Sequence, residues 1–323
     1  MPLERASIDR VRDDLAALTS AETRIGIAVS GGPDSLALLL LAGEARPGQV
    51  EAATVDHALR PESRAEAEMV AALCERLGVP HAILTASWNG KPETALQERA
   101  RTERYRLLSQ WANERGLGAI ATAHHLDDQA ETFLMRLVRG AGVNGLAGMR
   151  RIARVPGSDV PLIRPLLGWR HSELQAVCAD AGVEASRDPS NDDDQFERVR
   201  VRRKLEGVNW LNPAAVAASA GHLAEAEAAL EWAADQEWRR AVSDDDQTIV
   251  YRPTDCPPEI RRRVVRRAVI DLANEGDSDP RGREIDALLE TLAEGRKSTL
   301  RGVLCTGGAE WRFEPAPQRK LKR

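Results

Sequence analysis

Between residues 24 and 140, short apolar runs alternate with helix-type segments, and this alternation constrains the fold more than any other feature of the chain. The strand-type runs are residues 24–29, 49–57, 80–86 and 117–125. The segments between them have the apolar spacing of helices and cover residues 35–45, 63–78 and 94–116. A chain that repeats strand and helix in this way forms a parallel sheet with helices on both faces. The predicted fold class is therefore α/β.

The composition changes near residues 208–214, where a basic segment gives way to an alanine-rich one. A chain of 323 residues is long enough for two ordinary domains. We expect a catalytic domain over residues 1–210 and a smaller, mainly helical accessory domain over residues 211–323. The longest apolar run, LALLLLA, is too short to cross a bilayer, and the N-terminal residues lack a signal-peptide pattern. The sequence thus predicts a cytoplasmic protein that does not act at a membrane.

A glycine-rich turn, SGGPDS at residues 30–35, follows the first strand and opens the first helix of the repeat. The backbone N–H groups of such a turn form an anion site, and glycine lets an oxygen-rich ligand approach the chain closely. Phosphate is the expected occupant. The turn matches neither the G-x-x-x-x-G-K-[ST] phosphate loop nor the G-x-G-x-x-G dinucleotide turn. Taken alone, it is also compatible with an ordinary corner in which Asp34 or Ser35 caps the helix.

SGGPDS resembles the S-G-G-x-D-S pyrophosphate loop of the ATP pyrophosphatase superfamily, whose members cleave ATP to AMP and pyrophosphate while they activate a substrate as its adenylate. The resemblance implies ATP and Mg²⁺ as cofactors, with Asp34 helping to hold the metal. It also places the segment VDHALR, residues 55–60, beside the nucleotide. As a bare tripeptide, Asp56-His57-Ala58 is more typical of strand-end capping. The implied nucleotide-binding residues are Ser30, Gly31, Gly32, Pro33, Asp34, Ser35, Asp56 and His57.

Residues 121–149, ATAHHLDDQAETFLMRLVRGAGVNGLAGM, form the most specific stretch of the chain. Acids at the start of a helix suit its dipole. Asp128 lies three residues and Asp127 four residues before Glu131, so one helical face presents paired carboxylates. In isolation, such acids are usually solvated. Here two histidines precede them and the apolar FLMRLV follows them, which favours a helix docked at the same sheet edge as the glycine-rich turn.

This stretch, with RPLLGWRHSEL at 164–174 and DPSNDDDQFERVRVR at 188–202, is similar to the tRNA(Ile)-lysidine synthetase family over about residues 20–215. That family attaches free L-lysine to C2 of the wobble cytidine of the minor isoleucine tRNA with a CAU anticodon. The cytidine is first adenylated, AMP and pyrophosphate are released, and the lysidine formed makes the anticodon read AUA. The resemblance implies an ATP-dependent ligase that acts on this tRNA and on free lysine.

The resemblance also implies a set of catalytic residues. Asp128 and Glu131 match the lysine-binding acids of the family, and Arg198 or Arg202 is expected to meet the lysine carboxylate or a phosphate. Together with Asp34, these residues complete the predicted catalytic set. A lysine ammonium with a pKa near 10.4 must lose a proton before it attacks, which costs about 4–5 kcal/mol at pH 7. The site must therefore desolvate or deprotonate the amine, and which end of lysine the acids hold stays open.

The chain departs from the family pattern at Val199, where asparagine is usual. Basic residues gather at residues 198–204, 261–267 and 319–323. Such runs are more often solvated helix faces than binding sites, but a tRNA substrate favours phosphate contacts. We therefore expect the C-terminal domain to hold the tRNA body, although the net charge of −5 gives no overall basic field. The oligomeric state stays open, with a homodimer as one alternative.

Three other functions share the nucleotide loop. A tRNA thiolation enzyme needs paired or cluster-binding cysteines, and Cys74, Cys178, Cys256 and Cys305 form no C-x-x-C motif. A ligase that adenylates a small molecule explains the loop but not the histidine–acid helix and the arginines. A nucleotide-binding module without catalysis would bind ATP and release no pyrophosphate.

Overall fold

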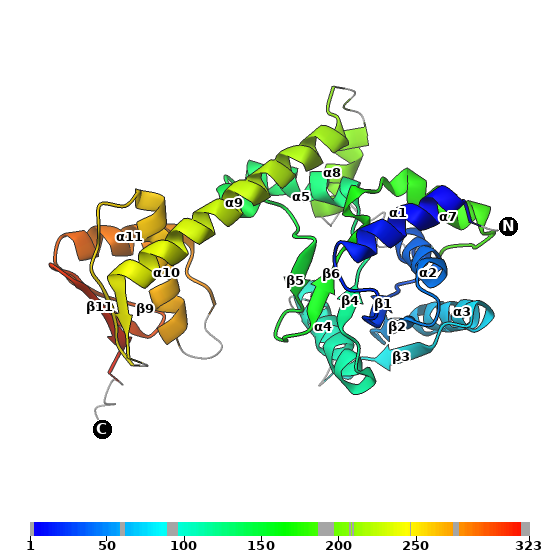
Figure 1. Cartoon of the computed structure of the whole chain (residues 1–323), viewed down its shortest axis with the longest axis horizontal. Helices are drawn as coiled ribbons and strands as arrows, with labels where there is room; N and C mark the ends of the chain where they lie inside the picture. The colour runs from blue at the N-terminus through cyan, green and yellow to red at the C-terminus, as the bar shows by residue number, and fades with distance from the viewer. Residues whose placement is uncertain are drawn as a thin grey trace. The chain divides into compact units, whose positions relative to one another are not determined.

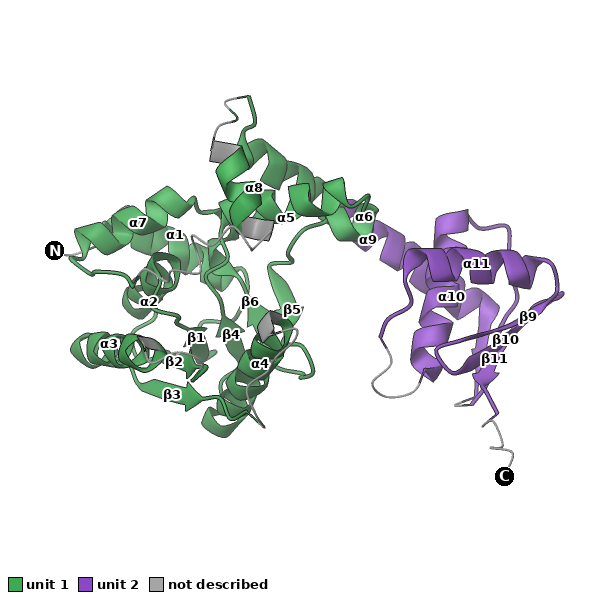
Figure 2. Cartoon of the chain, turned by 180° about the vertical axis from the view of Figure 1, so that it is seen from behind, with its two compact units in different colours: residues 1–224 green, residues 225–323 purple. Residues whose placement is uncertain are grey.

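The computed structural model describes residues 3–58, 62–88, 96–186, 197–206, 208, 210–245, 247–273 and 278–317. The chain divides into two compact units, residues 1–224 and 225–323 (Figure 2). The predicted boundary between residues 210 and 211 lies just before helix α9 (Pro213–Ala241), whereas the two units divide inside that helix. Among the helices described, none is both long and apolar enough to cross a membrane.

The first unit is built on a six-stranded sheet with the strand order β3-β2-β1-β4-β6-β5. Neighbouring strands are parallel except for β5, which pairs antiparallel with β6. The strands are β1 (Ile25–Ala28), β2 (Val50–Asp56), β3 (His81–Thr85), β4 (Ala119–Ala121), β5 (Ile152–Arg154) and β6 (Pro161–Ile163). The chain runs outward from β1 to β3 and then returns to the other side of β1 with β4. The strand order therefore reverses between β1 and β4, where a parallel sheet places its ligand site.

The helices of the first unit cover both faces of this sheet, so the predicted α/β class is confirmed. They are α1 (Arg5–Ala16), α2 (Pro33–Ala45), α3 (Glu62–Leu77), α4 (Leu96–Arg115), α5 (Leu126–Val138), α6 (Val143–Leu146), α7 (His171–Asp180) and α8 (Glu197–Glu206), with a short 3₁₀ turn, η1 (Pro165–Gly168). Figure 1 shows α4 on one side of the sheet and α1, α2, α3 and α7 on the other.

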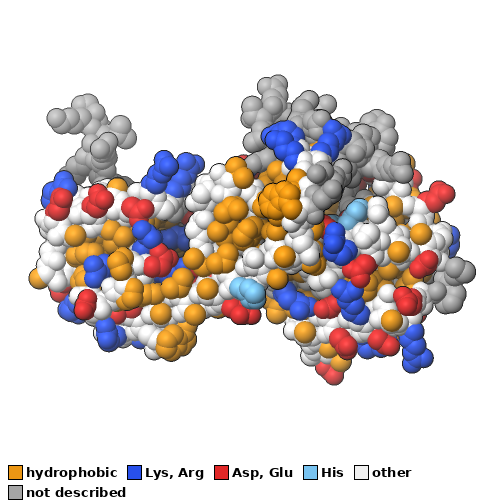
Figure 3. Space-filling view, turned by 90° about the horizontal axis from the view of Figure 1, so that it is seen from above, with side chains coloured by type: hydrophobic (Ala, Val, Ile, Leu, Met, Phe, Trp, Pro, Cys, Tyr) orange, Lys and Arg blue, Asp and Glu red, His pale blue; other side chains and the backbone are white. Residues whose placement is uncertain are grey.

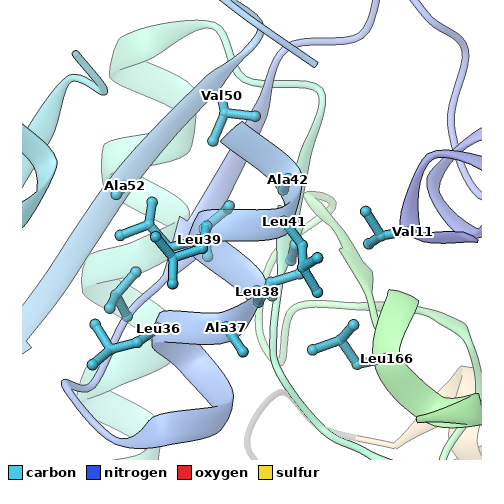
Figure 4. Packing of buried hydrophobic residues seen from close by; sticks show 14 of the residues in the cluster. Val11, Leu36, Ala37, Leu38, Leu39, Leu41, Ala42, Val50, Ala52 and Leu166 are labelled. Carbon is cyan, nitrogen blue, oxygen red and sulfur yellow. The ribbon is translucent and has the colours of Figure 1, made fainter. Parts of the chain in front are cut away.

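Side chains alternate across each strand, so every central strand contributes to two cores. Ala52 packs with α2, whereas its neighbour Ala53 packs with α4. Helix α2 is apolar on all sides, and Leu36, Leu38 and Leu39 are completely buried (Figure 4). A helix of this kind is stable only inside a protein. Its burial fixes the glycine-rich turn that precedes it.

Gly26 of β1 lies directly against Trp111 of α4. A β-carbon at position 26 would lie 2.5 Å from the Trp111 ring and 2.8 Å from Leu117. The absence of a side chain at this one position lets α4 pack closely on the central strand.

The second unit contains α10 (Pro258–Leu272), α11 (Gly282–Ala293) and an antiparallel sheet that sequence analysis did not predict. The sheet has the order β7-β8-β11-β10-β9. Its strands are β7 (Val242–Asp244), β8 (Ile249–Tyr251), β9 (Lys297–Leu300), β10 (Val303–Thr306) and β11 (Trp311–Pro315). The unit is therefore a layer of helices on a sheet, and the expectation of a mainly helical unit was incomplete.

The basic run of α10 is engaged in ion pairs inside this unit. Arg263 is 10% exposed and contacts Glu227, Glu231 and Glu259, and the side chain of Glu227 is fully buried. Arg267 pairs with Asp235 at 2.9 Å. These contacts hold α10 against residues 225–241 of α9, so much of the positive charge of residues 261–267 is neutralised within the fold.

We expect Gly26→Ala to destabilise the first unit, because the added methyl group must displace Trp111 or Leu117. Overpacking of this kind costs about 1–3 kcal/mol. Gly221→Ala in α9 is the matched control, since nothing lies within 4 Å of a β-carbon there and alanine stabilises a helix by about 0.5–1 kcal/mol. Denaturant unfolding of both variants measures the difference. Equal midpoints for Gly26→Ala and the wild type would contradict the packing described here.

Arg263→Gln is expected to lower the stability of the second unit by about 3–5 kcal/mol, because it leaves the buried carboxylate of Glu227 without its cation. Arg266→Gln on the same helix removes a half-exposed pair with Asp279 and should cost about 1 kcal/mol or less. Thermal unfolding followed by circular dichroism compares the two. Similar losses for both variants would show that Arg263 has no special role.

Candidate active site

The turn after β1 is held by hydrogen bonds between its own residues. Ser35 Oγ accepts the backbone N–H of Ser30 at 3.1 Å and donates to the carbonyl of Gly32 at 2.9 Å. Gly31 has a φ of +86°, a conformation that favours glycine. Pro33 starts α2, and the first N–H groups of a helix have no acceptor within the helix. The turn therefore presents N–H groups at the carboxyl edge of the sheet, as a phosphate site requires.

Asp34, in the first turn of α2, is contacted by histidines from two other segments. Its Oδ1 lies 2.7 Å from Nδ1 of His171, the first residue of α7, and its Oδ2 lies 3.7 Å from Nε2 of His125, the residue before α5. The hydrogen bond with Asp34 raises the pKa of His171. Asp34 thus joins the glycine-rich turn to the beginnings of α5 and α7.

The orientation of His125 is fixed by the cap of α5. Its Nδ1 accepts the backbone N–H of Asp128 at 3.3 Å, and its own backbone N–H donates to Oδ2 of Asp128 at 3.2 Å. This reciprocal pattern is a capping box. Because Nδ1 accepts, this hydrogen-bond pattern assigns the proton of the neutral ring to Nε2, which faces Asp34. His125 is 3% exposed, so the surrounding packing holds this arrangement.

Asp34, His125 and His171 could together hold a metal ion, since their ligand atoms lie within 4.8 Å of one another. Two imidazoles and a carboxylate would suit a zinc-type ion. However, Nε2 of His125 carries a proton in the tautomer assigned above, and His171 is hydrogen-bonded to the carboxylate. Asp34 remains as a hard oxygen donor. Mg²⁺ is commonly bound through one or two carboxylates, phosphate oxygens and water, so these residues fit Mg²⁺ better than zinc.

A cavity of about 350 Å³ adjoins the two histidines. Two ion pairs form part of its wall: Arg170 to Asp127 at 2.9 Å, and Arg202 of α8 to Glu131 at 2.7 Å. The lining residues are His125, Asp127, Ala130, Glu131, Arg170, His171, Ser172, Gln175, Arg202, Leu211 and Pro213. The cavity therefore offers both carboxylates and guanidinium groups, which are suited to a zwitterionic ligand.

The charges of these pairs are stabilised by their contacts. Burial alone would raise the pKa of Asp127, but hydrogen bonds from the backbone N–H of His171 and from Arg170 outweigh it and lower that pKa. In the same way, burial would lower the pKa of Arg202, but its hydrogen bond to Glu131 outweighs this effect and raises it. Asp127 and Arg202 therefore stay ionised at neutral pH.

The structure brings four of the predicted catalytic residues to one place, with differences in detail. Glu131 and Arg202 line the cavity, and Asp34 contacts both histidines of its wall. Asp128 directs one carboxylate oxygen back to the helix cap, so the cavity is lined by its neighbour Asp127 instead. Arg198 belongs to α8, but its side chain lies outside the described residues.

Asp56 is the last residue of β2 and His57 follows it, at the same edge of the sheet as the cavity. Neither residue lines the cavity. Asp56 Oδ1 accepts the backbone N–H of Ala58 at 2.9 Å and the hydroxyl of Ser63 at 2.7 Å, so it caps the end of the strand. The buried Nδ1 of His57 has no hydrogen-bond partner among the described residues, and burial lowers the pKa of this side chain.

Sequence analysis did not select Arg170 or His171. It noted Asp127 as an acid on the helix face of Glu131 but left it out of the catalytic set, and it noted His125 only as one of two paired histidines. Arg170 and His171 follow η1 and β6, and β6 lies next to β4 in the sheet. The rule that ligands bind beyond the carboxyl ends of parallel strands would have selected them if the place of β6 had been known. Val199, which replaces the usual asparagine, is 8% exposed, so this position faces the protein interior.

Comparisons with known proteins agree with this geometry. The PP-loop domain family matches residues 5–208. The tRNA(Ile)-lysidine synthase of Novosphingobium aromaticivorans is 48% identical over 317 residues, which cover 97% of this chain and 95% of the relative. The enzyme of the same name from Zymomonas mobilis is 43% identical and covers 92% and 90%.

Among solved structures, the U34-tRNA thiolase NcsA from Methanococcus maripaludis superposes with a TM-score of 0.57 at 18% identity, over 69% of this chain and 78% of that chain. At this identity, the likeness supports the PP-loop fold alone. The near full-length matches to curated relatives show the closer relationship: the chain belongs to the tRNA(Ile)-lysidine synthase family of PP-loop proteins.

Proposed function

We propose that the chain ligates L-lysine to C2 of the wobble cytidine of a tRNA(Ile) with a CAU anticodon, with cleavage of ATP to AMP and pyrophosphate. The observation that carries this proposal is the position of Asp34, which belongs to the phosphate-binding turn and contacts two residues of the cavity wall. Nucleotide and amino acid would therefore meet over one base. The reaction is placed in the cytoplasm, where tRNA is found, and does not require a homodimer.

In the first step, the turn would hold the β- and γ-phosphates against its N–H groups, with Gly31 and Gly32 allowing close approach and Ser30 and Ser35 keeping the turn in shape. Mg²⁺ bound at Asp34 would supply charge neutralisation for the phosphates. His125 and His171 orient the Asp34 carboxylate. The cytidine O2 attacks the α-phosphorus and pyrophosphate leaves, so that C2 of the base becomes electrophilic. Asp56 and His57 are proposed to lie beside the nucleotide.

In the second step, the cavity would hold lysine. Its α-carboxylate or its ammonium can exchange with one partner of the Arg202–Glu131 and Arg170–Asp127 pairs, since each pair provides one group of either sign. The ε-amine must lose a proton before it bonds to C2 and AMP departs. A carboxylate next to the ammonium is the natural proton acceptor, and we assign this role to Glu131, with Asp128 behind it in the helix cap.

Three of the four cysteines are poorly suited to tRNA thiolation, which requires reactive thiols. Cys74, Cys178 and Cys305 are buried, and burial raises the pKa of the first two to about 11 and of the third to about 12. Such thiols are not nucleophiles at neutral pH. These buried thiols therefore give no support to thiolation as an alternative function.

We propose residues 211–323 as an accessory tRNA-binding domain. On the face drawn in Figure 3, basic and acidic side chains are interspersed and neither sign dominates. Within residues 225–323, acidic residues slightly outnumber basic ones. Contacts of this domain with tRNA would therefore depend on individual side chains and not on a broad positive field.

The direct test is mass analysis of nucleosides from an unmodified isoleucine tRNA incubated with the protein, ATP, Mg²⁺ and lysine. We expect lysidine from the wild type. The activity of Asp34→Asn should be about 10²–10³-fold lower, because the loss of the carboxylate weakens the binding of the Mg²⁺ that would neutralise the charge of the phosphates. Asp9→Asn, an exposed acid of α1, is the control and should leave activity unchanged. Release of pyrophosphate without formation of lysidine would indicate another adenylating ligase. The absence of any pyrophosphate release would indicate a nucleotide-binding module without catalysis.

Glu131→Gln is expected to raise the KM for lysine by about 10- to 150-fold, which corresponds to the loss of one hydrogen bond to a charged group. The KM for ATP should change little, because Glu131 does not belong to the phosphate-binding turn. Glu68→Gln, which removes an exposed i,i+4 pair on α3, is the control. Steady-state kinetics with each substrate varied in turn gives the answer. Equal increases for ATP and lysine would argue against a lysine site at Glu131.

A further inference from the structure

Trp210 is one of the most exposed large apolar side chains described in the structure. It is 85% exposed and lies between α8 and α9. Burying a tryptophan is favourable, so its exposure leaves a large flat apolar surface in water. A ring that is this exposed contributes little to the stability of the fold.

The place of Trp210 links this exposed ring to the active site. The next residue, Leu211, lines the cavity together with Pro213, Glu131 and Arg202. The backbone N–H of Leu211 donates to the carbonyl of Val208 at 3.2 Å. Trp210 is therefore adjacent in the chain to a residue of the cavity wall.

Cationic side chains shortly precede Trp210 in the chain. Helix α8, which ends shortly before Trp210, carries Arg202 in the cavity wall and exposes Arg200, Arg203 and Lys204. An exposed aromatic ring beside several cations is the combination that single-stranded nucleic acids require, since the ring stacks on a base while the cations contact the phosphates. A tRNA presents such unstacked bases in its loops.

We propose that Trp210 is a stacking platform for an unpaired base of the tRNA anticodon loop next to the target cytidine. The proposal rests on the function proposed above, because it takes tRNA as the substrate. By stacking on the neighbouring base, Trp210 fixes the loop beside the cavity, and the target cytidine is turned into the cavity. The residue is a binding and positioning residue and takes no part in the bond-forming steps.

The test compares Trp210→Ala and Trp210→Phe with the wild type. Direct tRNA binding and the KM for tRNA should weaken by about 5- to 150-fold for Trp210→Ala, the range for loss of one base–aromatic stack. Trp210→Phe should retain most of the affinity, because it keeps a ring. The KM for ATP should be unchanged. Ile152→Ala is the control, since Ile152 of β5 is also an exposed apolar side chain, at 52%, and lies outside both the cavity wall and residues 211–323.

A second substrate series separates stacking from a merely structural effect. Anticodon stem-loops are prepared with an abasic site on either side of the target cytidine. The wild type should bind one of the two abasic stem-loops as weakly as Trp210→Ala binds the intact stem-loop. Trp210→Ala should bind this same abasic stem-loop no more weakly than it binds the intact one. Fully additive losses would overturn the proposal. A tRNA affinity of Trp210→Ala within twofold of the wild type would overturn it too. The proposal would also fail if Trp210→Ala altered only the self-association of the protein, measured by sedimentation, and left tRNA binding unchanged.

The result also distinguishes this inference from the proposed function. If the wild type forms no lysidine, the function fails, whereas tRNA binding by the two variants still decides the role of Trp210. If the wild type forms lysidine and Trp210→Ala binds and reacts equally well, only the stacking platform is wrong. The unfolding midpoint of Trp210→Ala should match the wild type, because an exposed side chain contributes little to stability.

Discussion

The contact between Asp34 and His171 connects the parts of the active site. Asp34 is fixed by the buried helix α2, and His171 starts α7, whose first backbone N–H also binds Asp127 of α5. Through these short contacts, three segments that are distant in the sequence share one edge of the sheet. Because α2 is buried on all sides, the turn that holds Asp34 has little freedom to move. The rigid core thereby determines how the glycine-rich turn lies relative to the cavity.

Much of the first unit could be predicted from sequence because its signals are local. The four central strands and the helices between them follow from apolar periodicity, and a strand–helix repeat leaves few topologies. The sheet of the second unit could not be predicted in this way. Its strands are three to five residues long, and the short β9 (Lys297–Leu300) shows little apolar character. Such strands form because they pair with one another and pack against α10 and α11, which no local pattern records.

The site shows the same division between local and long-range information. Ser30, Gly31, Gly32 and Asp34 lie in one short motif, so their role can be inferred directly from the sequence. Arg170 and His171 follow them by more than 130 residues, and their part in the site depends on where β6 enters the sheet. Asp127 and Asp128 illustrate a finer limit. Helix periodicity places both near the sheet edge, but only the cap formed with His125 decides which carboxylate faces the cavity.

Charge patterns in the sequence were the least reliable guide, and the structure gives the physical reason. The arginines of residues 261–267 look like a nucleic-acid footprint, yet Arg263 and Arg267 pair with acids of α9 and Arg263 also pairs with an acid of α10 itself. A buried or paired guanidinium cannot contact a phosphate without giving up its carboxylate, which costs more when that carboxylate is itself buried. Helix α8 also pairs an arginine with a buried acid, Arg202 with Glu131, but this pair lies in the cavity wall, and Arg200, Arg203 and Lys204 of the same helix are exposed. Recognition of a polyanionic substrate would therefore be concentrated beside the active site, where binding energy can act directly on the position of the reacting base.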